Sequence, residues 1–267
     1  MMFLSELLKT KRNAFLYLVI LFPIFIVALF FISFYRLTLE EFYKNIMPGN
    51  DNNPWYYYYN LLLFILAIAL PLVSSLITFI IKDIEDKANG WKVIFALPKA
   101  VLRIHFIKFL VISFYLFLYH AITLILTLIS VYILSILKPE FNFNSYPSYV
   151  VFLVGLFVKY FLISLAIGSL TYCIIIFIRK NVVSLLLSIF LPLIGMFFTS
   201  SFNIYSNVIS IISIPKQIRT RYILDYGSAH GLELTVPSDY DLYILAWVVF
   251  SWLLIYFQSK KPVINYS

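Results

Sequence analysis

The chain of 267 residues is 63% hydrophobic, and only 12% of its residues are charged, about half the fraction found in soluble domains. So little polar material cannot cover a water-facing surface, which excludes a soluble globular protein and predicts an all-α protein that crosses a membrane several times. The formal net charge of +8 does not indicate nucleic-acid binding, because the basic residues lie at the ends of apolar runs. Cys173 is the only cysteine, so no intrachain disulfide is expected.

Six apolar runs are long enough to cross a bilayer as helices, since about 20 residues at a rise of roughly 1.5 Å span a core of about 30 Å. The first run, residues 15–35, follows three basic residues and contains Pro23, where we expect a kink. It is longer than the apolar part of a signal peptide, and no small-residue cleavage site follows it, so we expect a retained helix. The other runs cover residues 60–81, 106–137, 149–178, 182–199 and 242–257.

The charges between these runs predict their orientation. If the N-terminus lies in the cytoplasm, 13 Lys and Arg residues fall on the cytoplasmic side and 6 on the other side. Because cytoplasmic loops carry the excess of basic residues, this bias predicts that both termini are cytoplasmic. We therefore expect residues 1–267 to form a single transmembrane domain with six spans.

The cytoplasmic stretch 82–108, after the second span, is the most charged part of the chain. Its middle is predicted to form a short amphipathic helix around Trp91, which Pro98 ends before the chain turns back into the third span. Such a helix lies flat on the membrane surface or presents one face to a soluble partner. The simpler alternative is a solvated basic connection between two spans.

A second irregular stretch, residues 200–241, connects the fifth and sixth spans on the external side. Its apolar part, residues 204–214, is too short and too rich in Ser and Asn to cross a membrane. We expect this part to be re-entrant or interfacial. The whole connection is longer than an ordinary loop, so it is predicted to carry structure of its own.

The six spans, the charged loop after the second span and the long external loop resemble the topology of the ABC-2 type permeases. Within that family the chain is most similar to the permeases of bacteriocin and lantibiotic immunity transporters. Those proteins often carry an acidic residue, a Trp-containing helix, a Leu-Pro pair and then basic residues before the third span. The topology matches over the whole chain, and the matching residues are Glu85, Trp91, Leu97, Pro98, Arg103 and Lys108.

This resemblance implies a permease subunit driven by a separate cytoplasmic ABC ATPase and paired with a second permease, either an identical copy or a sister chain. In that family the loop after the second span docks into a groove of the ATPase. The expected coupling residues are therefore Glu85, Asp86, Lys87, Trp91, Lys92, Leu97 and Pro98. The resemblance also implies a multi-pass protein of the bacterial cytoplasmic membrane, surrounded by lipids.

No Gly-x-x-x-x-Gly-Lys-Ser/Thr phosphate loop occurs in the sequence, so this chain is not expected to hydrolyse ATP. No cofactor is expected in it, and ATP and Mg²⁺ would be bound by the partner. His105, His120 and His230 lie far apart in the sequence and predict no metal site.

Three features inside the predicted spans are candidate functional positions. Lys159, in the fourth span, is a candidate contact for an anionic or lipidic cargo, although its long side chain can also reach the interface. His120, in the third span, lies either on a substrate pathway or in the packing of the helices, held by a hydrogen bond. Ser164 and Gly168, four residues apart, favour close packing of helices, within the chain or between subunits.

Three functional classes follow from these observations. The leading hypothesis is an exporter of membrane-active peptides, lipids or hydrophobic drugs, since the spans offer few polar groups to line a path for a hydrophilic solute. A non-transporting anchor or assembly subunit of a surface machine would show the same features. A membrane-embedded enzyme needs polar residues clustered at one depth, and the sequence does not reveal such a cluster.

Overall fold

The computed structural model describes residues 2–10, 13–38, 41, 54–87, 101–143, 149–178, 181–197 and 239–259. Two short elements in these ranges are α1 (Met2–Thr10) and the 3-10 turn η1 (Pro139–Phe141). The long helices are α2 (Ala14–Arg36), α4 (Pro54–Lys87), α6 (Val101–Leu137), α7 (Tyr149–Phe177), α8 (Asn181–Phe197) and α11 (Asp239–Ser259). No strand occurs in the described ranges, so the predicted all-α class is confirmed for them.

Each predicted span corresponds to one of the long helices. Among the described residues, three helices are long and apolar enough to cross a membrane, over Val19–Arg36, Leu102–Leu137 and Leu153–Phe177. α11 contains a shorter apolar stretch, Leu245–Gln258. These helices are consistent with a multi-pass membrane protein, whereas six crossings and cytoplasmic termini stay predictions.

The helices on either side of the predicted cytoplasmic loop are longer than we expected. α4 continues to Lys87 and α6 begins at Val101, so both ends of the 82–108 stretch are helical and the predicted loop was too long. The reason is that charged residues end the part of a helix that lies in lipid, while the backbone hydrogen bonds continue into water. The expected helix around Trp91 and residues 200–238 lie outside the described residues.

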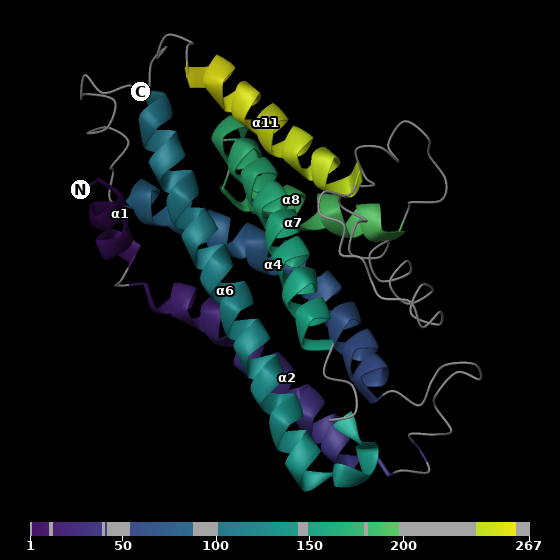
Figure 1. The fold of residues 1–267 in the computed structure, drawn as a ribbon. Helices are drawn as coiled ribbons and strands as arrows, with labels where there is room; N and C mark the ends of the chain where they lie inside the picture. The colour runs from purple at the N-terminus through teal and green to yellow at the C-terminus, as the bar shows by residue number, and fades with distance from the viewer. Residues whose placement is uncertain are drawn as a thin grey trace.

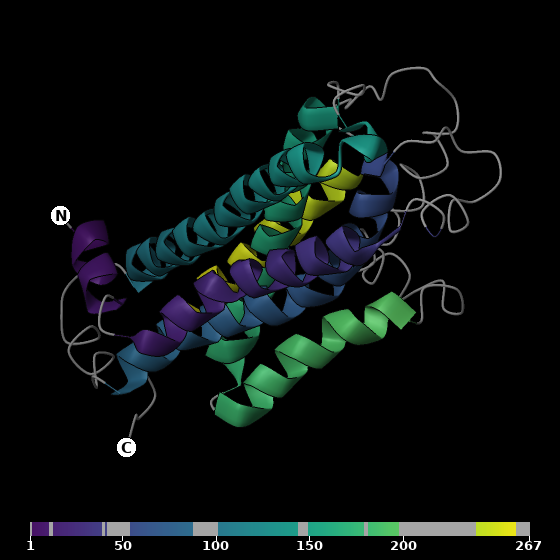
Figure 2. The ribbon, with the colours of Figure 1, turned by 90° about the horizontal axis from the view of Figure 1, so that it is seen from below.

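The long helices lie side by side in an elongated bundle (Figure 1). α1, the last turns of α4 and α11 and the first turns of α6 lie at one end, which we call the α1 end (Figures 1 and 2). η1 lies at the opposite end, which we call the η1 end. α7 contacts α4, α6, α8 and α11, and its apolar stretch is the most buried of the three. α8 lies at the edge of the bundle (Figure 2).

Buried apolar side chains form two clusters that follow one another along the bundle. The proximal cluster, toward the α1 end, includes Val19, Ile77, Leu116, Cys173 and Ile255. The distal cluster, toward the η1 end, includes Phe34, Tyr58, Leu134, Phe141 and Phe157. Large apolar side chains also stay exposed on the outside of α2, α6, α8 and α11, as expected where lipid replaces water as the solvent.

Candidate functional site

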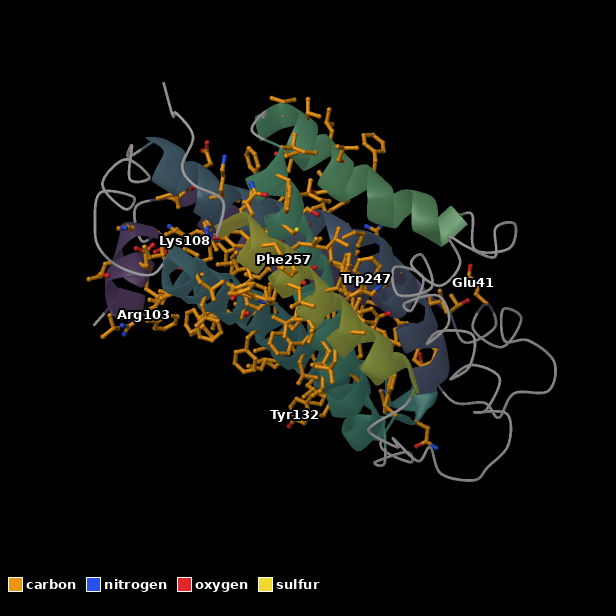
Figure 3. The ribbon with its side chains drawn as sticks, turned by 90° about the horizontal axis from the view of Figure 1, so that it is seen from above. Glu41, Arg103, Lys108, Tyr132, Trp247 and Phe257 are labelled. Atoms are coloured by element: carbon orange, nitrogen blue, oxygen red, sulfur yellow. The ribbon has the colours of Figure 1, made fainter. Side chains whose placement is uncertain are left out.

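The helices on either side of the predicted coupling segment reach the α1 end of the bundle (Figure 1). The backbone of Glu85, Asp86 and Lys87 forms the last turn of α4. The side chains of these three residues lie outside the described part of the chain, as do all of Trp91, Lys92, Leu97 and Pro98. Arg103 and Lys108 lie on the first turns of α6, close to α1 (Figure 3). The structure therefore places the two helices that flank the expected coupling segment next to α1.

The sequence reading missed α1, an amphipathic helix that packs against α6. Phe3 and Leu7 pack against the proximal cluster, and the ring of Phe3 meets Phe114 edge-on at a centroid distance of 6.2 Å. Leu4 and Leu8 are exposed. The i, i+4 spacing of Phe3 and Leu7 was the available signal. A helix of 9 residues is too short for that spacing alone to predict it.

A buried cation holds α1 against α6. The side chain of Lys108 is only 1% exposed, and its Nζ lies 3.4 Å from Oε2 of Glu6 on α1. The other carboxylate oxygen of Glu6 accepts a hydrogen bond from the exposed Lys9 at 2.7 Å. Because a buried charge is costly unless it is paired, Glu6 stabilises Lys108 in this position and fixes α1 to α6. The sequence places Lys108 at the entry to the third predicted span and does not predict its burial or its pairing with Glu6.

Two hydrogen bonds extend this contact to neighbouring helices. The hydroxyl of Thr10 donates to the carbonyl of Leu7 at 2.7 Å and therefore accepts a hydrogen bond from the hydroxyl of Tyr115 on α6. Nδ1 of His105, also on α6, and the hydroxyl of Tyr172 on α7 share a hydrogen bond of 2.8 Å. These polar side chains link α1, α6 and α7 at the end where α4 and α6 lead to the expected coupling segment.

We call this set of residues the polar linkage: Glu6, Thr10, His105, Lys108, Tyr115 and Tyr172. These contacts join the first turns of α6 to α1 and α7. In the described ranges, no three His, Cys, Asp or Glu side chains lie together as a metal site requires.

Of the two titratable candidates inside the spans, His120 and Lys159, the structure describes the side chain of His120 alone. His120 is buried on α6, where its ring packs edge-on against Tyr119 and Phe161 at centroid distances of 5.3 and 6.2 Å. It has no hydrogen bond to another described residue, so the expected hydrogen bond is replaced by aromatic packing. Lys159 lies on α7, and its side chain is outside the described part. A role for either residue in a substrate pathway stays a prediction.

Gly168 confirms the prediction of close helix packing. A Cβ at this position would lie 3.3 Å from Leu116 on α6 and 3.5 Å from the hydroxyl oxygen of Thr78 on α4. Ser164, one turn before it on α7, is fully buried. Small residues here let three helices of the same chain approach one another closely.

Buried hydroxyl side chains inside the bundle are a further feature that the sequence reading missed. Ser75 on α4 donates to the backbone carbonyl of Ser188 on α8 at 2.9 Å and lies 3.3 Å from the hydroxyl of Thr171 on α7. Others donate to carbonyls of their own helices, as Thr123 does to Tyr119 at 2.7 Å. Such bonds let Ser and Thr lie in an apolar interior. Some of these hydroxyl residues recur at helical spacing, as Thr123, Thr127 and Ser130 do on α6, and this spacing was the available signal.

The η1 end is built from aromatic rings. Phe34 of α2 packs against Tyr58, Phe141 and Phe143 at centroid distances of 5.4, 5.3 and 5.6 Å. The hydroxyl of Tyr58 is hydrogen-bonded to Ser130 on α6 at 2.6 Å. These contacts join α2, α4, α6 and the residues that follow η1.

Beyond α2, Thr38 and Glu41 form a capping box at the end opposite Arg103 and Lys108 (Figure 3). The backbone N–H and the hydroxyl of Thr38 donate to Oε2 of Glu41 at 3.0 and 2.9 Å. Both hydrogen bonds stabilise the ionised carboxylate and therefore hold the pKa of Glu41 below its usual value. The bond from the backbone N–H has the larger effect.

Comparison with protein families supports the resemblance seen in the sequence. A family model described as "ABC-2 family transporter protein" matches residues 2–195. The match covers α1, α2, α4, α6, α7 and most of α8, and it contains the whole polar linkage. No curated protein and no solved structure matches the chain. The family resemblance is confirmed, and the bacteriocin-immunity subgroup stays a prediction.

Proposed function

The chain belongs to the ABC-2 family of transporter proteins, and on that premise we propose that it is the permease subunit of an ATP-binding cassette exporter. Permeases of this family work with a separate ABC ATPase subunit, generally as dimers. The observation that carries the proposal is the family match, which extends over residues 2–195 of 267. The proposed cargo is hydrophobic or amphipathic: a membrane-active peptide, a lipid or a drug.

In this proposal the ATPase acts on the α1 end. The partner binds ATP and Mg²⁺, and the contact that this chain supplies is the segment 84–108. Because that segment joins the last turn of α4 to the first turns of α6, its displacement moves both helices. The ion pair between Glu6 and Lys108 carries the movement to α1, and the hydrogen bond between His105 and Tyr172 carries it to α7.

The character of the helices supports a cargo that partitions into lipid. α2, α6, α8 and α11 expose large apolar side chains, and the described interior is apolar apart from scattered hydroxyl groups, His105, His120 and Lys108. A hydrophilic solute would need a continuous polar lining to cross such a bundle. We therefore propose that the cargo enters from the bilayer and moves between this chain and a second permease, and that Lys159 contacts an anionic group on it.

Co-purification tests the proposal. The tagged chain is expressed with each ABC ATPase of its native host and purified in a mild detergent. We expect one ATPase to co-purify in a fixed ratio, and the complex to hydrolyse ATP. Substitution Trp91→Ala or Glu85→Gln should lower that hydrolysis about tenfold or more, since hot-spot contacts carry most of an interface's energy. The control Glu140→Gln, an exposed acidic residue at the η1 end, should leave it unchanged.

Two results would oppose the proposal. The exporter hypothesis fails if no ABC ATPase binds, or if hydrolysis by the complex is unaffected by both substitutions at the α1 end. A stable complex that hydrolyses ATP but moves no hydrophobic cargo in vesicles favours the alternative function, an anchor or assembly subunit of a surface machine.

A further inference from the structure

On α2, α4, α6 and α11, one cluster gives way to the other within a short stretch of the helix. On α2 and α4 that stretch contains a proline, Pro23 and Pro71, and both prolines are buried. The nearest buried cluster members on either side are Ile20 and Ile26 on α2, and Leu70 and Val73 on α4. Both helices therefore pass from one cluster to the other near a proline, which has no backbone N–H to donate to the preceding turn.

On α6 and α11 the corresponding stretch contains a hydroxyl residue. On α6, Thr123 lies between the proximal Ile122 and the distal Leu124, and on α11 the buried Ser251 lies between Val248 and Trp252. On α7 the clusters overlap, because the proximal Phe161 and Leu165 lie among distal members, and Gly168 directly follows the last distal member, Ile167. We call the five residues at these positions the boundary layer: Pro23, Pro71, Thr123, Gly168 and Ser251.

The prolines and Thr123 weaken the helices that carry them. A proline in a helix removes one N–H···O bond, and its ring pushes against the carbonyl of the preceding turn. The hydroxyl of Thr123 bonds the carbonyl of Tyr119 on its own helix, an arrangement that bends helices slightly. Gly168 instead lets α7 approach α4 and α6 closely. Three helices, α2, α4 and α6, are therefore weakened where the clusters meet.

Two buried hydroxyl groups beside the boundary layer have no hydrogen-bond partner in the part of the chain that the structure describes, those of Ser74 and Tyr119. Ser74 lies one helical turn from Thr78, and Tyr119 lies one turn from Leu116. Thr78 and Leu116 both border the position of Gly168, so Ser74 and Tyr119 each lie one helical turn from a residue at the same helix crossing. A buried hydroxyl without a partner is costly, so an arrangement of the helices that pairs these groups would be favoured over this one.

We propose that the boundary layer is a hinge. The proximal half of the bundle, with α1 and the polar linkage, moves as one body relative to the distal half, and Ser74 and Tyr119 gain hydrogen bonds in the second arrangement. α4 runs from this hinge to the expected coupling segment, so movement of the ATPase would drive the bending. Only this driving force rests on the proposed function, because the hinge itself is a property of this chain.

Distances between pairs of spin labels test the hinge in the full-length chain in lipid nanodiscs, with Cys173 replaced by Ser. Labels at the exposed Tyr17 and Phe177 report on the proximal half, and labels at the exposed Ile32 and Val154 report on the distal half. The pair Tyr17 and Val154 spans the boundary layer. We expect a wider distance distribution for the spanning pair than for either pair within one half.

Proline substitutions then locate the flexibility. Pro23→Ala and Pro71→Ala, made singly and together, restore helical hydrogen bonds and should narrow the spanning distribution to about half its width. The distributions within each half should not change. Pro139→Ala, at an exposed position in η1, is the matched control and should leave all three distributions unchanged. The single variants keep the test decisive if the double variant fails to fold.

The outcomes separate the hinge from the proposed function. The hinge is overturned if the spanning distribution is as narrow as the others, or if neither proline substitution narrows it. Adding the ATPase with a trapped nucleotide tests the driving force. If the ATPase shifts the distance of the spanning pair and of neither other pair, the hinge and the proposed coupling are both supported. If the alanine substitutions narrow the spanning distribution but the ATPase causes no shift, the hinge stands and the coupling is contradicted.

Discussion

The two ends of the bundle are held together by different interactions. At the α1 end, polar side chains more than 100 residues apart in sequence pair with one another, as Glu6 does with Lys108 and Thr10 with Tyr115. At the η1 end, Phe34 is surrounded by aromatic rings, and polar contacts such as those of Tyr58 with Ser130 and of Lys138 with the carbonyl of Leu37 accompany them. A charge pair or hydrogen bond holds in one geometry, whereas ring packing tolerates small shifts without losing its area. We therefore call the α1 end the responsive end, because we propose that its contacts transmit movement, and the η1 end the structural end, because its packing stabilises the bundle.

The largest expected effect comes from breaking the structural end. Phe34→Ala removes a ring that touches three others and leaves a cavity, for which buried Phe substitutions cost about 3–5 kcal/mol. The melting temperature of the purified protein in detergent should fall by several degrees. Phe25→Ala is the matched control, since Phe25 lies on the same helix but is 61% exposed. Equal losses for the two variants would show that the ring cluster does not stabilise this end.

Breaking the responsive end should affect coupling more than stability. Glu6→Gln removes one charge partner of the buried Lys108, which we expect to cost about 1–3 kcal/mol in stability. In the complex with the ATPase it should also weaken the stimulation of ATP hydrolysis by cargo. Lys9→Gln removes only the exposed partner of Glu6 and should change stability by less than about 0.5 kcal/mol. If both variants retain full stimulation, the ion pair does not carry the movement.

A smaller effect is expected at the link between α6 and α7. Tyr172→Phe keeps the ring but loses the hydrogen bond to His105, which is worth about 1 kcal/mol. Thermal unfolding compares this variant with Tyr132→Phe, which changes an exposed tyrosine on α6. The account predicts a lower melting temperature for Tyr172→Phe alone, and no difference between the two variants would remove His105 and Tyr172 from the polar linkage.

The smallest expected effect is the pH dependence at the end of α2. The pKa of Glu41 is lowered in the folded chain, so its contribution to stability is present above the usual carboxyl pKa and is lost as the pH falls through the lowered value. NMR titration of the Glu41 carboxyl group should show the lowered pKa, and Thr38→Val, which removes the donating hydroxyl, should raise it. An unchanged titration in Thr38→Val would mean that the hydroxyl contributes nothing to the cap.

Long apolar runs predicted the helices well, because a span of lipid demands a continuous stretch of apolar residues. α2 and α7 begin and end within one residue of the predicted spans. The sequence could not predict that Lys108 is buried, because its partner Glu6 is 102 residues away and lies on a helix too short to be predicted. The position of the boundary layer could not be predicted from the sequence either. Pro23 and Pro71 were visible in the sequence, but their common depth depends on how the helices are packed.

Photo-crosslinking from the two ends of the bundle tests the central claim most directly. A photoreactive phenylalanine analogue replaces Trp91, in the segment between α4 and α6, or Tyr132, which is exposed on α6 toward the η1 end (Figure 3). Cells that also express the ATPase are then irradiated. The account predicts an adduct with the ABC ATPase from position 91 and none from position 132. An adduct from position 132, or none from position 91, would contradict it.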